Sequence, residues 1–202
     1  NLSDLATAKQ HLLNVANNYG LSLQDNFADV FDTRNKANSE IILAVRFAEG
    51  EATNAFGQYV YNIGTGQTTN DAYLVDGTLF VDPLSIAGSG SMQRYEYVEE
   101  LFNSFDLEDS RRDATFLAAY NKDEDDNLVF RGTHVRKNIG AINNSGIRVW
   151  TGDMVFYRLS WVYLTLAEIA NMENDNAKVE EYINLIRERA YGENWAPEFE
   201  FE

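Results

Sequence analysis

The sequence predicts a mostly α-helical fold with irregular loops and short β-hairpins. Three observations carry this prediction. In the last third of the chain, two adjacent segments place apolar residues at helical spacing. A middle segment, residues 48–91, is rich in Gly, Asn, Thr and Ser and shows no helical period. Two β-type segments, 115–120 and 127–135, flank an acidic turn, which is typical of a β-hairpin.

The first element expected is a helix over residues 3–19. Ser3 can cap its start and Gly20 can end it. Its apolar residues are Leu5, Ala8, Leu12, Val15, Ala16 and Tyr19. A strand is expected next at 40–47, where β-branched residues are dense. Because this strand is short and almost continuously apolar, we expect it to be buried.

Residues 48–153 are expected to form a loop-rich insertion with short strands. A helical pattern returns at 95–105, before the predicted β-hairpin. Residues 137–152 are again rich in Gly and Asn. Because loops carry binding residues more often than regular elements do, we expect ligand contacts in this insertion.

Residues 154–192 are expected to form a helical hairpin. From 156 to 172, apolar residues occupy nearly every face of the helical wheel, which predicts a core helix covered on several sides. We therefore expect Trp161 and Leu164 to be buried. Residues 174–176 are Asn, Asp and Asn, which favour turns and N-caps, so a second helix should start there.

The second helix of the hairpin has one apolar face and is expected to end at Gly192. Glu168 is the only acidic residue inside the first helix. A buried carboxylate is costly unless it is paired. We therefore expect a structural ion pair between Glu168 and either Arg187 or Arg189.

The same hairpin carries a partial tetratricopeptide pattern. With Trp161 at the tryptophan of the repeat, Leu164 falls at its leucine and Ala177 at the alanine of its second helix. Three signature positions depart from the repeat: Thr165, Glu168 and Glu181. We expect tetratricopeptide-like hairpins in an incomplete array, with the 3–19 helix as the second helix of an earlier repeat.

The composition excludes several classes of function. Lys and Arg total 16 against 32 Asp and Glu, and the net charge of −16 repels nucleic acids and anionic lipids. No cysteine is present, so the chain has no disulfide, thiolate metal site or cysteine nucleophile. No run of about 18 apolar residues predicts a membrane-spanning helix.

We expect no catalytic residues, no cofactor and no metal site. His11 and His134 are the only histidines, and neither belongs to a recognisable catalytic or zinc-binding motif. The acidic turn from Asp123 resembles a calcium loop only superficially. An EF-hand needs Gly at loop position 6 and Glu at position 12, where this chain has Leu128 and His134. We expect a solvated hairpin tip.

Aromatic and amide side chains in the insertion favour carbohydrate binding. The apolar face of a sugar ring stacks on a flat aromatic side chain, and its hydroxyls bind short polar groups. The alternative is ordinary burial, since two aromatic residues two positions apart can both face a core. The candidate carbohydrate-binding residues are Tyr59, Tyr61, Tyr73, Trp150, Asn62 and Arg148.

Three sequence motifs are more specific to one protein family than these patterns are. They are Tyr163-Leu-x-Leu-Ala-Glu with Tyr182-Ile-Asn-x-Ile-Arg-x-Arg-Ala, then Asn38-Ser-Glu-Ile-Ile-Leu, and Leu101-Phe-x-x-Phe followed by Asp109-x-Arg111. Together they resemble the SusD/RagB family of surface glycan-binding lipoproteins from Bacteroidetes. The order of the expected elements fits that family along nearly the whole chain.

The resemblance implies a non-catalytic protein at the outer-membrane surface. It would bind oligo- or polysaccharide and deliver it to a SusC-like TonB-dependent transporter. Residues 1–202 would be the middle of such a protein, forming one domain, and membrane contact would come only through a lipid anchor absent from this chain. The alternative is a tetratricopeptide-like scaffold that binds another protein, which the hairpin by itself supports.

Overall fold

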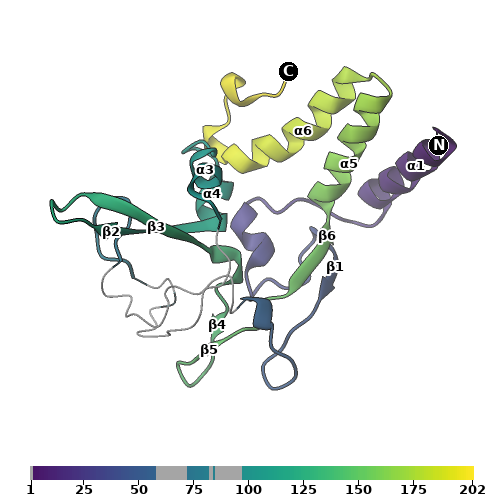
Figure 1. Ribbon diagram of the computed structural model, residues 1–202. Coiled ribbons are helices and arrows are strands. Elements are labelled where there is room, and N and C mark those ends of the chain that lie inside the picture. The colour runs from purple at the N-terminus through teal and green to yellow at the C-terminus, as the bar shows by residue number, and fades with distance from the viewer. Residues whose placement is uncertain (1, 58–71, 82–83, 85–96) are drawn as a thin grey trace. The chain divides into compact units, whose positions relative to one another are not determined.

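The computed structural model divides into two compact units (Figure 1). Unit 1 consists of residues 1–30, 35–45 and 155–202, and unit 2 of residues 31–34 and 46–154. The residues whose structure is described are 2–57, 72–81, 84 and 97–202. Among them, no helix combines the length and the hydropathy needed to cross a membrane.

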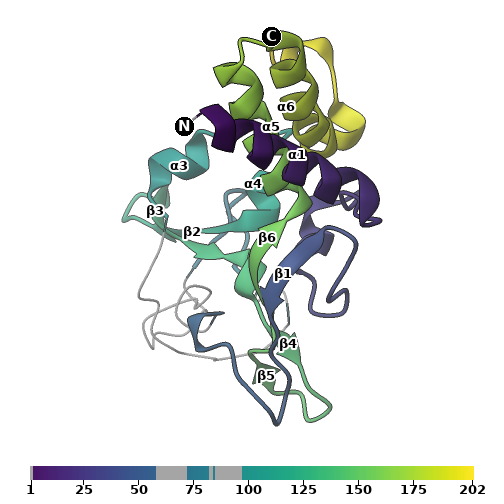
Figure 2. The same ribbon diagram turned by 90° about the vertical axis from the view of Figure 1, so that its right-hand side faces the viewer.

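Three helices build unit 1: α1 (Leu2–Asn18), α5 (Leu159–Met172) and α6 (Asn176–Tyr191). The central helix, α5, packs against both α1 and α6 (Figure 2). Because each contact covers one side of α5, the core is a continuous apolar layer between the helices. Its buried members are Leu159, Val162, Leu166, Ala167 and Tyr182.

Three helix ends follow the local sequence signals, whereas Ser3, expected to cap α1, lies inside that helix. Asp175 is the N-cap of α6, and its side chain accepts a hydrogen bond from the backbone N–H of Lys178 (3.2 Å). Gly192 follows α6 with φ +54°, and Gly20 lies just past α1 with φ +66°. These left-handed conformations favour glycine and end both helices. The predicted 3–19 helix and the predicted helical hairpin are confirmed.

The first residues of the predicted core helix form a strand instead. β6 (Met154–Arg158) pairs with β1 (Ile41–Val45) in a two-stranded sheet. The helix begins only at Leu159, whose N–H donates to the carbonyl of Glu40 (2.9 Å). We expected the strand at 40–47, which is β1, to be buried. This prediction is wrong for three of its apolar residues, because a two-stranded sheet covers little of its own surface. They are Ile42, Leu43 and Val45.

The expected burial of Trp161 and Leu164 is also wrong, since these side chains are 45% and 48% exposed. Both lie on one stripe of α5, three residues apart, and Glu168 continues the stripe four residues later. α1 and α6 cover the other faces of α5. The sequence predicted a helix covered on several sides, and the structure confirms this for two of them.

The described residues of unit 2 include the short helices α3 (Glu99–Asn103) and α4 (Ser110–Thr115). They lead into an antiparallel hairpin of β2 (Phe116–Lys122) and β3 (Leu128–Val135), which confirms the predicted β-hairpin. A second small hairpin pairs β4 (Ala141–Ile142) with β5 (Arg148–Val149). Across both units, the part of the chain that the structure describes includes 3-10 helices at Phe27–Phe31, Arg136–Asn138, Gly192–Asn194 and Pro197–Phe199.

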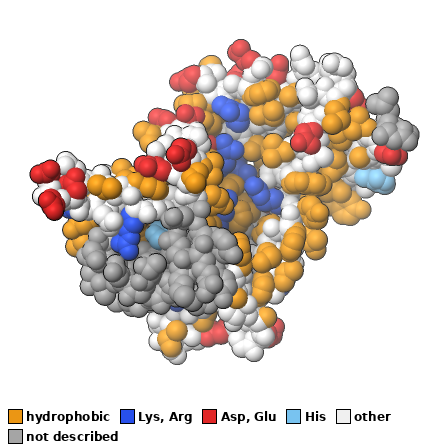
Figure 3. All heavy atoms as spheres, in the orientation of Figure 1, with side chains coloured by type: hydrophobic (Ala, Val, Ile, Leu, Met, Phe, Trp, Pro, Cys, Tyr) orange, Lys and Arg blue, Asp and Glu red, His pale blue; other side chains and the backbone are white. Residues whose placement is uncertain are grey.

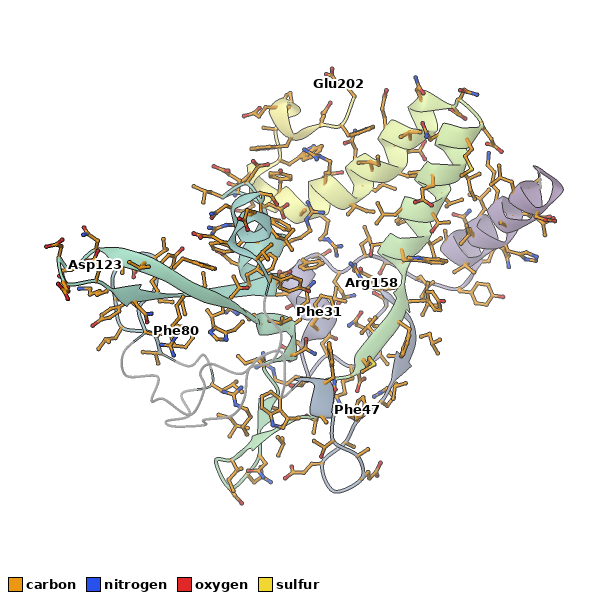
Figure 4. All side chains as sticks on the ribbon, viewed as in Figure 1. Phe31, Phe47, Phe80, Asp123, Arg158 and Glu202 are labelled. Carbon is orange, nitrogen blue, oxygen red and sulfur yellow. The ribbon has the colours of Figure 1, made fainter. Side chains whose placement is uncertain are left out.

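The β2–β3 hairpin has two differently packed faces. Ala119 belongs to a buried cluster with Ala72 and Phe80 on one face. Phe80 lies on the side of the hairpin away from α3, and Asp123 marks the hairpin tip (Figure 4). On the other face, Phe116 packs among aromatic rings at the base of the hairpin. A fold of helices, short strands and irregular loops results, as the sequence predicted.

Candidate functional site

Backbone at two glycines lies close to the indole of Trp150. It follows β5, is half-buried and packs on the cluster of Ala72, Phe80 and Ala119. A Cβ added at Gly57 or at Gly140 would lie 3.4 Å from Trp150 Cε3. Gly140 also has φ +80°, and its Cβ would lie 2.6 Å from the carbonyl oxygen of Val149. The two glycines therefore let the backbone approach the indole closely.

A guanidinium lies beside this indole. The Arg148 Cζ is 5.4 Å from the centroid of the Trp150 ring, within the range of a cation–π contact. Arg148 Nη1 donates a hydrogen bond to the carbonyl of Ile139, which fixes the direction of the side chain. The structure thus brings together two of the predicted site residues, Trp150 and Arg148.

Asn54 ties the segments around Trp150 to one another. It is buried, and its N–H donates to the carbonyl of Trp150 (2.8 Å). Its Nδ2 donates to the carbonyl of Gly152 (2.8 Å), and its Oδ1 accepts from the N–H of Gly57 (3.2 Å). Every polar group of this buried amide side chain therefore serves to position backbone near the indole.

Tyr73 lies beside the β2–β3 hairpin. Its N–H donates to the carbonyl of Tyr120 (2.8 Å), and its carbonyl accepts from the N–H of Tyr120 (2.9 Å). The ring is half-buried, and Lys122 Nζ lies 4.9 Å from its centroid. The backbone contacts give Tyr73 a fixed place at the edge of the hairpin.

Tyr73 and Trp150 do not share one site. The neighbours of Tyr73 in the chain, Ala72 and Leu74, pack in the same cluster as Trp150. Side chains alternate along extended backbone, so Tyr73 faces the opposite way. Three other predicted contact residues, Tyr59, Tyr61 and Asn62, lie outside the described residues.

Unit 1 has its own cluster of charged side chains, centred on Glu40. This carboxylate is fully buried beside Arg158. Figure 4 labels Arg158 where β6 meets α5. Arg158 Nη1 donates to Glu40 Oε1 (2.5 Å), and Arg189 Nη1 donates to Oε2 (2.9 Å). The N–H of Gln24 also donates to Oε2 (3.0 Å). Four separate segments of unit 1 therefore meet at one carboxylate.

Both arginines also flank a buried ring. The Cζ atoms of Arg158 and Arg189 lie 5.5 and 5.1 Å from the centroid of Phe27. Burial by itself raises the pKa of the Glu40 carboxyl, but the charge of Arg189 and the hydrogen bonds from Gln24, Arg158 and Arg189 lower it below its usual range. Glu40 is therefore ionised at neutral pH and holds the arginines in place.

The expected ion pair of Glu168 is wrong. Glu168 is exposed, Arg189 binds Glu40, and Arg187 Nε donates to the carbonyl of Phe199. The physical reason is the uncovered stripe of α5: a carboxylate in water has no need of a buried partner.

The acidic turn and the two histidines have contrasting surroundings. Asp123 Oδ1 accepts from the N–H groups of Asp125 (2.9 Å) and Asn127 (2.8 Å), so the turn is closed by its own hydrogen bonds. Within the described ranges, no group of three or more His, Asp or Glu could hold a metal ion. His134 is buried with its ring edge-on to Phe80, and His11 is exposed on α1.

Sequence reasoning missed the structural roles of Glu40 and Asn54. A signal existed for Glu40, which stands at the start of an apolar strand inside the stretch Asn38-Ser-Glu-Ile-Ile-Leu. An acid at that place needs a buried partner if the strand packs in a core. The sequence marked Asn54 only as a polar side chain suited to sugar hydroxyls, because its structural role depends on backbone groups that only the fold brings near it.

The chain matches known proteins over nearly its whole length. The model of the SusD family matches residues 24–198. A SusD superfamily protein from Bacteroides fragilis NCTC 9343 is 53% identical, with a TM-score of 0.91, and the match covers 100% of this chain and 42% of that one. NanU of B. fragilis is 30% identical, with a TM-score of 0.83, over 98% of this chain and 40% of that one. The chain thus spans less than half the length of these solved structures.

A more distant structure shares the fold. The surface glycan-binding protein A from Bacteroides thetaiotaomicron, in complex with laminarihexaose, is 18% identical, with a TM-score of 0.62. The match covers 99% of this chain and 44% of that one. No curated protein matches the sequence.

Proposed function

Because this chain belongs to the SusD family, we propose that it binds oligo- or polysaccharide without catalysing a reaction. The observation that carries the proposal is the pairing of Trp150 with Arg148 in unit 2. Support also comes from the glycan-binding protein in complex with laminarihexaose, which has the same fold.

The geometry of this pair suits a sugar. The C–H face of a pyranose ring stacks on an indole, while a guanidinium at its edge donates to the ring hydroxyls. Gly57, Gly140 and Asn54 hold the indole and its flanking backbone before any ligand arrives. Little conformational entropy is then lost on binding, which favours affinity.

The remaining parts of the proposal rest on the family. The parent protein would lie at the outer-membrane surface and pass the bound glycan to a SusC-like TonB-dependent transporter. Tyr59, Tyr61 and Asn62 stay candidate contacts, and the folding of residues 1–202 as one domain stays a prediction. No cofactor is needed for binding of this kind.

The test compares two arginine variants of unit 2 in affinity electrophoresis against a panel of polysaccharides. Arg148→Gln should weaken glycan binding by about 1–1.5 kcal/mol, roughly a factor of ten, because it removes a charged hydrogen-bond donor beside the indole. The control is Arg136→Gln, a change at an exposed arginine that donates to the carbonyl of Asp113 (3.3 Å). Its binding should equal that of the unmodified chain.

Two results contradict this proposal in different ways. If no polysaccharide retards the unmodified chain, glycan binding is wrong. If a glycan binds and Arg148→Gln leaves the affinity unchanged, the class of ligand survives and the site does not.

A second candidate is the tetratricopeptide-like scaffold, and the exposed stripe of α5 favours it. Trp161 and Leu164 are exposed there, and the ring of Tyr157 lies 4.9 Å from that of Trp161, centroid to centroid. Such a stripe suits contact with another protein surface. Trp161→Ser should then abolish binding of a protein partner and leave polysaccharide binding intact, whereas Arg148→Gln should do the reverse.

A further inference from the structure

The β2–β3 hairpin presents a partly open aromatic face toward its tip. At the base of this face, Phe116 is covered by the rings of Tyr97, Phe102 and Phe105, with centroids 5.0, 5.9 and 5.4 Å away. A β-bulge then interrupts the register between Ala119 and Tyr120. Beyond the bulge, the face carries Tyr120, Lys122 and Phe130, with Tyr73 alongside. We call these four residues the hairpin shelf.

The rings of the hairpin shelf are fixed and still accessible. Tyr120 and Phe130 pair across the strands, with ring centroids 5.8 Å apart and planes at 78°. Tyr73 is bound to Tyr120 by two backbone hydrogen bonds, and Lys122 Nζ lies over its ring. All four side chains are half-buried, so each keeps part of its surface in solvent. A rigid aromatic surface of this kind offers contact area at a small cost in entropy.

Polar groups accompany the rings of the hairpin shelf. At the tip, Lys122 Nζ pairs with Asp126 Oδ1 (2.9 Å). Figure 3 shows acidic side chains gathered at the end of the hairpin, with hydrophobic ones beside them. The hydroxyl of Tyr120 is influenced by the charges of Glu99 and Arg112. Burial raises the pKa of Tyr120, the charge of Glu99 raises it further, and Arg112 opposes this shift. The hydroxyl therefore stays protonated at neutral pH and can both donate and accept.

We propose that the hairpin shelf is a second oligosaccharide-binding site, independent of Trp150 and Arg148. The inference rests on the proposed function and adds a site to it. Flat rings flanked by a hydroxyl, an ammonium and carboxylates match the apolar face and the hydroxyl edge of a sugar. Uncharged glycans fit best, because Lys122 is already paired with Asp126 and the chain carries a net charge of −16.

The two sites face opposite ways from one short segment. Ala72 and Leu74 pack in the cluster that supports Trp150, whereas Tyr73, between them, belongs to the hairpin shelf. One short oligosaccharide cannot stack on both faces of the same extended segment. A short ligand should therefore bind twice per chain, and a long polysaccharide should gain affinity from engaging both sites.

The experiment is titration calorimetry on the whole chain. An affinity-gel panel of laminarin, xyloglucan, pullulan and polygalacturonate first identifies the ligand, and a short oligosaccharide of that glycan is then titrated. The unmodified chain should bind two molecules. Tyr73→Leu and Tyr120→Leu keep apolar volume but remove a flat ring, and each should reduce the stoichiometry to one. Each should also weaken retention by the polysaccharide about tenfold.

The matched control is Val129→Ala, next to Phe130 in β3. Val129 is exposed, and strand alternation directs it to the other face, so both binding events should remain. The melting temperature of each variant shows whether the hairpin is intact. If Tyr120→Leu unfolds the chain, the stoichiometry of Tyr73→Leu, at the edge of the hairpin, tests the second site.

The outcomes distinguish failure of the second site from failure of the proposed function. A stoichiometry of one that Arg148→Gln removes and Tyr73→Leu leaves intact overturns the second site and keeps the proposed function. If Tyr73→Leu and Tyr120→Leu each still bind two molecules, the second site is also overturned. A chain that none of the four polysaccharides retards overturns the proposed function and the second site together. Stronger binding to polygalacturonate than to the neutral glycans overturns the preference for uncharged sugars.

Discussion

The buried ring of Phe27 in unit 1 and the rings of Trp150 and Tyr73 in unit 2 all have cations beside them, but these contacts are buried to different depths. In unit 1, Arg158 and Arg189 flank Phe27, which is 3% exposed, and both bind the carboxylate of Glu40. In unit 2, Arg148 and Lys122 lie beside the half-buried rings of Trp150 and Tyr73. The same pair of side-chain types thus lies in the core at Phe27 and near the surface at Trp150 and Tyr73.

The difference teaches how one kind of contact can serve stability or recognition. A buried cation needs a carboxylate partner, because an uncompensated charge in a low-dielectric interior is costly. Glu40 meets this need, and breaking the cluster should mainly change stability. A cation over a half-exposed ring needs no such partner and leaves ring surface that a ligand can contact. Changes in unit 2 should therefore act more on binding.

The largest expected effect comes from Glu40→Ala. Removing one partner of a buried ion pair leaves two arginines without their shared carboxylate, which typically costs about 3–5 kcal/mol of unfolding free energy. Urea or thermal denaturation would measure it. The control is Glu168→Ala on the exposed stripe of α5, which should stay within about 0.5 kcal/mol. Equal effects of the two changes would show that the Glu40 cluster adds nothing special to unit 1.

The same cluster predicts a pH dependence. The pKa of Glu40 is lower in the folded chain than its ordinary value, so its contribution to stability is complete above that ordinary value. It is lost as the pH falls through the lower, folded pKa, where the carboxylate becomes protonated. The melting temperature of the unmodified chain should drop more steeply on acidification than that of Glu40→Gln.

A smaller effect is expected from Gly140→Ala in unit 2. A Cβ there meets the carbonyl of Val149 at 2.6 Å in a left-handed conformation, and such strain costs about 1–3 kcal/mol. Gly146→Ala is the control, since Gly146 has φ +75° but open space around it. Its cost should be about 1 kcal/mol or less. Gly140→Ala should also weaken glycan binding by displacing Trp150, whereas Gly146→Ala should not.

The smallest effect on stability is expected from Trp161→Ala. A fully buried tryptophan would cost about 3–5 kcal/mol, but this side chain is 45% exposed, so we expect about 1 kcal/mol. The variant should also reduce self-association of the isolated chain, because it shortens an exposed apolar stripe. Sedimentation velocity would measure this. A loss near 4 kcal/mol would mean that the stripe is covered after all.

The sequence predicted the secondary-structure elements better than it predicted which side chains their neighbours cover. The α1 helix, the α5–α6 hairpin and the β2–β3 hairpin follow from apolar spacing, capping residues and turn residues, which act within a few positions of the chain. The predictions for Trp161, Leu164 and Glu168 failed for one shared reason. Apolar spacing shows which faces of a helix could be covered, but not which neighbours are present to cover them.

The candidate site shows the same limit. Residue type by itself selected Trp150 and Arg148 as partners for a sugar, and the structure places them side by side. The sequence could not show that Tyr73 faces away from Trp150. Nor could it show that Tyr120 and Phe130 join Tyr73 on the hairpin shelf. Those relations depend on strand register and on a β-bulge.

Local interactions determine the helices and the hairpins, so the sequence by itself predicted them. The family resemblance also came from the sequence by itself. Tertiary structure decided which acid is buried, which aromatic rings stay accessible and which of them share a face. The physical reason is that burial and pairing involve residues far apart in the chain, such as Glu40 with Arg158 and Arg189. Their energies depend on a three-dimensional arrangement that no short stretch of sequence contains.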